Sequence, residues 1–280
     1  MDGETTDEFE GAAPRARGRT AMTTQTTSAE GFFNADRRWA WGSVLTGLAL
    51  WEFASRVLVG SKLFLAAPTQ VLYALYELVA TGEIWKHVWT SAQEFVIGYV
   101  SACLLGVALG FAMASSRPAK AALQPWVAGL YATPTVALAP LFILWFGIGI
   151  FSKVVVVVAL VVFPVTINTE TGLLGVNKNL VETVRAFGAT PRQIFFKVSL
   201  PAALPFIFAG LRLGIGRGLI GVVVAELFGA RAGLGQLISQ SAETFNMPDL
   251  FAGVTILAVA GIALTGGFQR LERTLIPWRD

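Results

Sequence analysis

Arg217 and Glu226, two charged side chains in the apolar run Leu204–Phe228, are candidates for contact with a charged solute. Arg217 lies close to the middle of the run, where an arginine costs roughly 2.5–3.5 kcal/mol on membrane-insertion scales. Its planar guanidinium can bind an oxyanion through two hydrogen bonds, so one interpretation places Arg217 on the path of an anionic solute. In the other interpretation Arg217 is structural and binds helix carbonyls or Glu226 of a second copy. Glu226 stands near one end of the run, and Arg212 is close enough to the other end to reach the interface.

Prolines interrupt the neighbouring apolar runs and point to the same path. Pro134 and Pro140 fall within one run, and Pro164 falls within the next. A proline removes one helical hydrogen bond and bends the helix, and broken helices in transporters often line the solute path. A purely structural kink explains these prolines equally well. The candidate translocation path comprises Pro134, Pro140, Arg217 and Glu226.

The sequence lacks the residues for several other kinds of chemistry. Gly216–Gly221 matches G-x-G-x-x-G, but it lies in an apolar run with no preceding strand, so it does not predict dinucleotide binding. No G-x-x-x-x-G-K-[ST] motif exists, so ATP would have to be bound by a partner subunit. The single histidine, His87, has no ligand cluster around it, and the single cysteine, Cys103, permits no disulfide framework. We therefore expect no metal, no cofactor and no enzyme activity in this chain.

The elements that would hold the charged residues are membrane helices. Apolar residues make up 54% of the 280 residues and charged residues 14%, against about 25% charged in soluble domains, and the mean hydropathy is +0.63. About 20 apolar residues span a bilayer. The pattern predicts an all-α integral membrane protein with six spans: Trp41–Val59, Ser91–Ser115, Leu123–Phe146, Lys153–Thr171, Leu204–Phe228 and Leu250–Phe268. We expect the shorter amphipathic stretch Pro68–Gly82 to lie at the outer interface, with a seventh span as the alternative.

The distribution of lysine and arginine sets the expected orientation. Cytoplasmic loops of membrane proteins carry more of these residues than outer loops do. If the amino terminus lies inside, the outer segments hold only Lys62, Lys86, Lys153 and Arg231 of the 21 lysines and arginines. Both termini are then cytoplasmic. Residues 1–38 are polar and lack the apolar core of a signal peptide, so we expect a disordered cytoplasmic tail before a transmembrane domain at 39–280, with Met22 as an alternative start.

Small residues recur at four-residue steps in two of the predicted spans. Membrane helices associate through close backbone approach at such positions. The rows are Gly98, Ala102, Gly106, Gly110 and Ala114 in the second span, and Gly210, Gly214 and Gly218 in the fifth. We expect these rows to pack against other helices or a partner subunit. Chance is the alternative, because glycine and alanine are abundant in this chain.

A polar-leaning stretch, Gly175–Pro201, lies between two spans and reads GVNKNLVETVRAFGATPRQIFFKVSLP. Asn179 with Glu182 three residues later is close to a capping box. Gly188 suits the left-handed position that ends a helix. The first half of the stretch therefore predicts a short capped helix followed by a tight turn.

The second half of this stretch predicts another helix. Thr190 followed by Pro191 is a typical helix start, and Pro201 and Pro205 are expected to end the helix before the next span. The spans on both sides fix the unit at the membrane surface, so a DNA-binding helix-turn-helix is disfavoured. We expect residues 175–203 to form a cytoplasmic docking loop, with an ordinary amphipathic connector as the alternative.

This loop resembles the cytoplasmic loop of binding-protein-dependent ABC transporter permeases. Their pattern is E-A-A, three residues, Gly, nine residues, Ile, one residue and Leu-Pro. The positions that correspond here are Glu182, Thr183, Val184, Gly188, Val198, Leu200 and Pro201. The chain departs from the pattern at Thr183, Val184 and Val198, and the first two are β-branched and poorer helix formers than alanine.

Four further stretches resemble the nitrate, sulfonate and taurine branch of these permeases. They are APTQVLYAL near Pro68, LAPLFILWFGIG at Leu138–Gly149, FPVTINT at Phe163–Thr169 and GLRLGIGRGLIGVVVAEL at Gly210–Leu227. The resemblance extends from near Trp41 to the carboxyl terminus.

The resemblance implies an ABC importer permease fold and a homodimer in the cytoplasmic (inner) membrane. The partners it implies are cytoplasmic ABC ATPase subunits, an extracytoplasmic solute-binding protein and membrane lipid, with no nucleic acid. ATP would drive alternating access through the docked loops. The implied solute is a small oxyanion such as an alkanesulfonate, taurine or nitrate, and another small organic solute, for example a pyrimidine precursor, is the alternative. A secondary transporter fits less well, because we find no internal repeat and expect few buried acids.

Overall fold

The computed structural model describes residues 29–59 and 64–279, which form helices and connecting turns without a strand. The chain divides into two units, Met1–Ala49 and Leu50–Asp280. The first unit holds most of α1 (Ala29–Phe53), which a π-helical turn at Ala54–Val59 continues. Because α1 begins at Ala29, residues 29–38 are helical, which corrects that part of the predicted disordered tail at 1–38. Residues 1–28 of the predicted tail lie outside the described residues.

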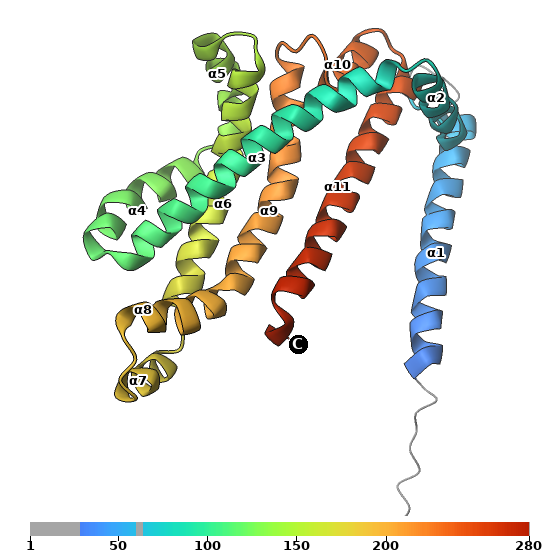
Figure 1. The fold of residues 1–280 in the computed structure, drawn as a ribbon. Coiled ribbons are helices and arrows are strands. Elements are labelled where there is room, and N and C mark those ends of the chain that lie inside the picture. The colour runs from blue at the N-terminus through green and yellow to red at the C-terminus, as the bar shows by residue number, and fades with distance from the viewer. Residues whose placement is uncertain (1–28, 60–63, 280) are drawn as a thin grey trace, which may run out of the picture. The chain divides into compact units, whose positions relative to one another are not determined.

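Three long helices form the centre of the second unit (Figure 1): α3 (Glu83–Ser115), α6 (Ile150–Leu174) and α9 (Leu200–Leu227). α6 is in extensive contact with both α3 and α9 and is the most deeply buried of the three. A helix that is apolar all round is typical of such a buried position. The central core consists of Phe95, Ala102, Val157, Val161, Val165, Ile215 and Val222.

The rows of small residues on α3 and α9 pack mainly against α6. A Cβ atom added to Gly110 on α3 would lie 2.6 Å from Thr169 Cβ, and one added to Gly210 on α9 would lie 2.7 Å from Asn168 Cβ. Real side chains do not approach so closely, so the helix backbones come together because the glycine side chains are absent. Similar overlaps with α6 occur at Gly98, Gly106 and Gly214, whereas Gly218 meets Phe95 of α3.

A second, smaller core lies at one end of this bundle, here called the α10 end. It joins α2 (Pro68–Ala80), α10 (Leu234–Glu243) and the first turns of α3 and of α11 (Met247–Leu275). Its buried residues are Ala66, Val71, Ala74, Leu78, Ile84, Leu234, Leu237 and Ala252. α2 has 13 residues, a length of about 20 Å, which is too short for a span. It therefore fits the predicted interfacial helix rather than a seventh span.

Four helices among the described residues are long and apolar enough to cross a membrane: α3, α6, α11 and the continuous helix Pro191–Leu227. A fifth candidate is broken. α4 (Arg117–Ala132) meets the segment Thr135–Phe146, which contains α5 (Ala139–Phe146), at an angle of 85°. α1 does not meet this criterion over its described residues, so the count of six spans stays a prediction.

The predicted span Leu123–Phe146 is interrupted at Pro134, as the prolines in this run indicated, whereas Pro140 lies in the first turn of α5. Thr133 is extended, with ψ of 136°, as residues before proline usually are. A 3-10 turn, Thr135–Leu138, then leads into α5.

The expectation that Pro201 and Pro205 end the second loop helix is wrong. The helix runs without interruption from Pro191 to Leu227. A π-helical segment, Phe195–Ser199, precedes α9 and places Pro201 in the first turn of α9, where a missing N–H group is tolerated.

Candidate functional site

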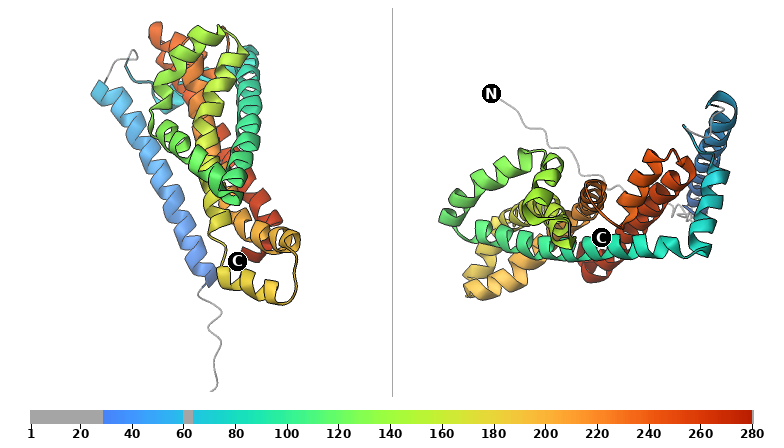
Figure 2. Two further views of the ribbon diagram at one scale, coloured as in Figure 1. Left: turned by 90° about the vertical axis from the view of Figure 1, so that its left-hand side faces the viewer. Right: turned by 90° about the horizontal axis from the view of Figure 1, so that it is seen from above.

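The predicted docking loop projects beyond the ends of α6 and α9 (Figures 1 and 2). Its first helix is α7 (Lys178–Ala186), and Asn177 rather than the expected Asn179 caps it, accepting from Asn179 N at 2.9 Å. Gly188 has φ of +82° and follows the end of α7. The N–H groups of Gly188 and Ala189 bond back to the last turn, which is the Schellman arrangement that ends a helix.

Thr190 caps the second helix, α8 (Pro191–Ile194), as predicted. Gln193 N donates to Thr190 Oγ1 at 3.4 Å, and Thr190 N donates to Gln193 Oε1 at 2.8 Å, which forms a capping box. At the junction between α8 and α9, the pattern residues Val198, Leu200 and Pro201 are half-buried. These local contacts give the loop a defined shape.

The surface of α7 remains uncovered by the rest of the described chain. No residue of α7 is buried. Phe187 is 88% exposed and Leu180 is 49% exposed, and their seven-residue spacing puts them on one face of the helix. Glu182 and Thr183 are exposed, while Val184 is half-buried on the same side as Leu180. An amphipathic helix with an open apolar face can bind a groove on another protein.

Arg217 lies beside the break between α4 and α5. Its Nη2 donates to Tyr131 Oη at 3.1 Å, and its guanidinium carbon lies 5.0 Å from the centre of the Tyr131 ring. Tyr131 belongs to the last turn of α4. Pro134 and Pro140, on either side of the 3-10 turn, are exposed. The fold thus brings a half-buried cation next to an exposed stretch of irregular backbone.

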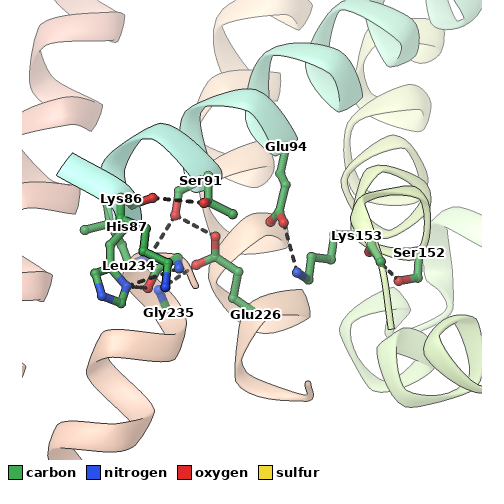
Figure 3. Close-up of polar contacts among 12 residues, drawn as sticks. Lys86, His87, Ser91, Glu94, Ser152, Lys153, Glu226, Leu234 and Gly235 are labelled. Atoms are coloured by element: carbon green, nitrogen blue, oxygen red, sulfur yellow. Dashed lines mark hydrogen bonds and ion pairs between the residues drawn. The ribbon is translucent and has the colours of Figure 1, made fainter. Parts of the chain in front are cut away.

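Glu226, the fourth residue of the predicted path, lies elsewhere, at the α10 end. Its side chain is 1% exposed. It accepts from Ser91 Oγ at 2.5 Å and from Gly235 N at 2.6 Å (Figure 3). The carboxylate of Glu226 is therefore bound within its own chain, and Arg217 is not among these partners.

Sequence reasoning missed a buried ion pair between α3 and α6. Lys153 Nζ lies 3.0 Å from Glu94 Oε1, and the two side chains are 7% and 1% exposed (Figure 3). Lys153, which the sequence analysis counted with the outer segments, is therefore buried between two helices. The buried acids of the described residues are Glu94, Glu226 and Glu272, which agrees with the expectation of few. The available signal was an acidic residue, Glu94, inside an apolar run, since such residues usually have a partner.

Two further ion pairs join helices in the half of the bundle nearer α7. Arg212 Nη1 lies 3.3 Å from Glu272 Oε2 and links α9 to α11. Lys120 Nζ lies 2.9 Å from Glu170 Oε1 and links α4 to α6. Arg212 thus pairs with a glutamate of another helix, whereas the sequence suggested that its side chain extends to the membrane interface. Within residues 29–59 and 64–279, no group of three or more His, Cys, Asp or Glu side chains is placed to hold a metal ion.

Comparison with known families identifies most of the bundle. Residues 104–277 match the family described as binding-protein-dependent transport system inner membrane component. The chain is 36% identical to the putative aliphatic sulfonates transport permease SsuC of Bacillus subtilis, over 83% of this chain and 84% of that protein. It is 34% identical to the formylaminopyrimidine transport permease ThiX of Halalkalibacterium halodurans, over 83% and 92%. It is 31% identical to the taurine transport permease TauC of Escherichia coli, over 85% and 88%.

Solved structures share the fold. A chain of the inward-facing MetNI methionine ABC transporter gives a TM-score of 0.59 at 23% identity, covering 68% of this chain and 95% of that chain. A chain of an amino acid ABC transporter gives a TM-score of 0.56 at 17% identity, covering 72% and 97%. These matches confirm the all-α importer permease fold that the sequence predicts.

Proposed function

The chain belongs to the family of binding-protein-dependent transport system inner membrane components, and we propose that it carries a small sulfonate or a similar oxyanion. As a member of this family it is the membrane-spanning permease subunit of an ATP-driven importer and works with ATPase subunits and a solute-binding protein. The observation that carries the solute proposal is Arg217 beside the α4–α5 break. A guanidinium in a low-dielectric path offsets the charge of a sulfonate and can bind two of its oxygens.

The names of two similar proteins support this solute class. SsuC is a putative permease for aliphatic sulfonates and TauC is a permease for taurine, and both solutes carry a sulfonate group. ThiX supports a second candidate, a formylaminopyrimidine, at comparable identity. Arg217 favours the sulfonate, because a permanent cation in the path suits an anion better than a neutral base.

The α4–α5 break supports a homodimer in which the path lies between two copies. Non-helical backbone at membrane depth is tolerated where protein covers it or where it lines a water-filled cavity. Pro134, Val136 and Ala137 at the break are exposed in the single chain. A second copy facing this break would provide both the cover and the opposite wall of the path.

The α7–α8 loop is proposed to be the docking site for the ATPase. Its exposed apolar face lacks a partner in the described chain, and exposed Arg185 and Arg192 flank it. The residues with this proposed role are Glu182, Thr183, Val184, Gly188, Val198, Leu200 and Pro201. Closure of the ATPase dimer would move the loops and, through them, the helices along the path. This chain would itself bind no ATP and catalyse no reaction.

The orientation that follows puts the α7 loop in the cytoplasm, where ATP is available, and the α10 end on the outer face. Both termini are then cytoplasmic and the protein crosses the inner membrane several times. The basic residues of the loop, Arg185, Arg192 and Lys197, agree with this orientation.

Uptake into vesicles tests the proposed function. The complete complex is reconstituted with its solute-binding protein and ATP on the loop side, and a panel of taurine, butanesulfonate, nitrate and formylaminopyrimidine is offered. We expect ATP-dependent uptake of at least one sulfonate. Uptake of formylaminopyrimidine alone would favour the second candidate, and uptake that ignores ATP would contradict the importer.

A further inference from the structure

Side chains from other helices cap the N-terminus of α10 (Figure 3). The start of a helix leaves backbone N–H groups without partners inside the helix. In α10 the Leu234 N–H donates to Ser91 Oγ at 2.8 Å, and the Gly235 N–H donates to Glu226 Oε2 at 2.6 Å. Ser91 Oγ also donates to Glu226 Oε1 at 2.5 Å. One serine of α3 and one glutamate of α9 thus hold the first turn of α10.

His87 completes this cap from one turn earlier in α3. Its Nδ1 lies 3.2 Å from Gly233 N and 2.8 Å from Gly233 O, so the ring accepts from the N–H or donates to the carbonyl according to its tautomer. His87, Ser91 and Glu226 are all buried, at 7%, 5% and 1% exposure. Water therefore competes little for these bonds.

The turn before α10 is shaped around this carboxylate. Gly233 has φ of +136°, and a Cβ atom added there would overlap the Glu226 carboxylate. A Cβ atom added to Gly235 would lie 2.6 Å from Val223 O and 3.0 Å from Glu226 Oε2. Glycine on both sides of Leu234 is what lets the helix start reach α9.

This cap also connects the two apolar cores of the unit. Leu234 and Leu237 belong to the smaller core at the α10 end, which includes α2 and the first turn of α11. Glu226 extends from α9 four residues after Val222, a member of the central core. The joint between the cores is therefore polar and buried.

We propose that Glu226 is a positioning residue for transport, which fixes α10 to α3 and α9 with the help of Ser91 and His87. Docking of the solute-binding protein on the α10 end then moves α3 and α9 instead of tilting α10 alone. This places Glu226 outside the solute path. The inference rests on the proposed function, because it takes the α10 end as the face that meets the binding protein.

The test uses the reconstituted complex and binding protein loaded with the panel compound that the wild type transports, taurine in the expected case. The variants are Glu226→Gln, which keeps the shape, and Ser91→Ala, which removes the shared hydroxyl. Ser152→Ala is the matched control, because the buried Ser152 hydroxyl donates to Gly149 O within its own turn. Two quantities are measured: ATPase activity with and without binding protein, and amide hydrogen exchange of α10.

We expect the basal ATPase rate to stay unchanged in both variants and the stimulation by binding protein to fall about tenfold, as the loss of one buried hydrogen bond suggests. Exchange of the Leu234–Leu237 amides should rise by a similar factor, while exchange in α6 stays unchanged. Ser152→Ala should match the wild type.

Two results would overturn the proposal. One is stimulation and α10 exchange in both variants equal to those of Ser152→Ala. The other is a parallel fall of basal and stimulated rates, or a loss of assembled complex in both variants, which would indicate a role in folding alone. A wild-type complex that no binding protein stimulates would instead count against the proposed function, and α10 exchange would still decide whether the cap exists.

Discussion

At the scale of single residues, the cations of the bundle differ in how they are neutralised. Lys153 pairs with Glu94 and Arg212 pairs with Glu272, so their charges are offset inside the chain. Arg217 contacts the phenol of Tyr131, which holds the guanidinium in place without cancelling its charge. A charge held in this way remains available to an anion.

Substitution of Arg217 should separate the two interpretations of this residue. Arg217→Gln removes the charge, and we expect sulfonate uptake to fall by at least about tenfold, as for loss of one charge-assisted contact. Arg217→Lys keeps the charge but loses the planar fork, so uptake should fall less. Uptake is measured beside membrane level and ATPase recovery. Unfolded protein in both variants would favour a structural role, and full uptake by Arg217→Gln would remove Arg217 from the path.

The buried pair of Lys153 and Glu94 should be worth more to stability than to transport. Lys153→Met leaves the Glu94 carboxylate buried without its partner, and breaking such a pair typically costs about 3–5 kcal/mol. The double variant Lys153→Met with Glu94→Met removes both charges, so thermal unfolding in detergent should recover most of the loss. Equal destabilisation in the single and double variants would show that the charge is not the cause.

At the scale of elements, local signals predicted the loop well, whereas the behaviour of prolines needed the structure. Gly188, Thr190 and Pro191 act on their immediate neighbours, so their roles can be predicted from a few residues. Pro134 breaks a helix while Pro201 does not, because the outcome depends on whether the surrounding helix can rearrange its hydrogen bonds. The Glu94–Lys153 contact joins residues from different helices, and no local pattern indicates that pairing.

The exposed face of α7 should control ATPase binding without affecting folding. Phe187→Ser removes a ring that is 88% exposed, so the stability of the permease should hardly change. We expect recovery of the ATPase on co-purification to fall by at least about tenfold, since buried aromatic anchors dominate interfaces. Phe64→Ser serves as the control, because the Phe64 side chain is 71% exposed and lies far from Phe187 in the sequence. Equal recovery with both variants would contradict docking at α7.

At the scale of the whole molecule, the fold class and the family were predictable, because the six apolar runs and the loop pattern together cover most of the chain. The number of spans was less predictable. The run that contains α4 and α5 is bent by 85°, and α1 does not qualify as a span by length and apolarity taken together over its described residues. The composition identifies the chain as a membrane protein. Whether one apolar run crosses the bilayer or turns back depends on the backbone geometry at one or two residues.

Reporter fusions test the orientation. A reporter that is active only outside the membrane should be silent when fused after Asp280 and active when inserted after Phe245, in the exposed turn between α10 and α11. The same reporter inserted after Gly188 should be silent. An active fusion after Asp280 would show that the number of spans is odd.

The π-helical segment Phe195–Ser199 has a geometric consequence for the coupling of the two ends. A π-bulge adds one residue to a helix, and each residue turns an α-helix by about 100° and lengthens it by about 1.5 Å. The bulge therefore sets the rotational phase between the docking loop and α9. Deleting one residue there would leave both helices intact but would turn the α7 face by roughly a quarter of a revolution about the α9 axis. The permease and its ATPase would then each be folded, and their surfaces would no longer face one another.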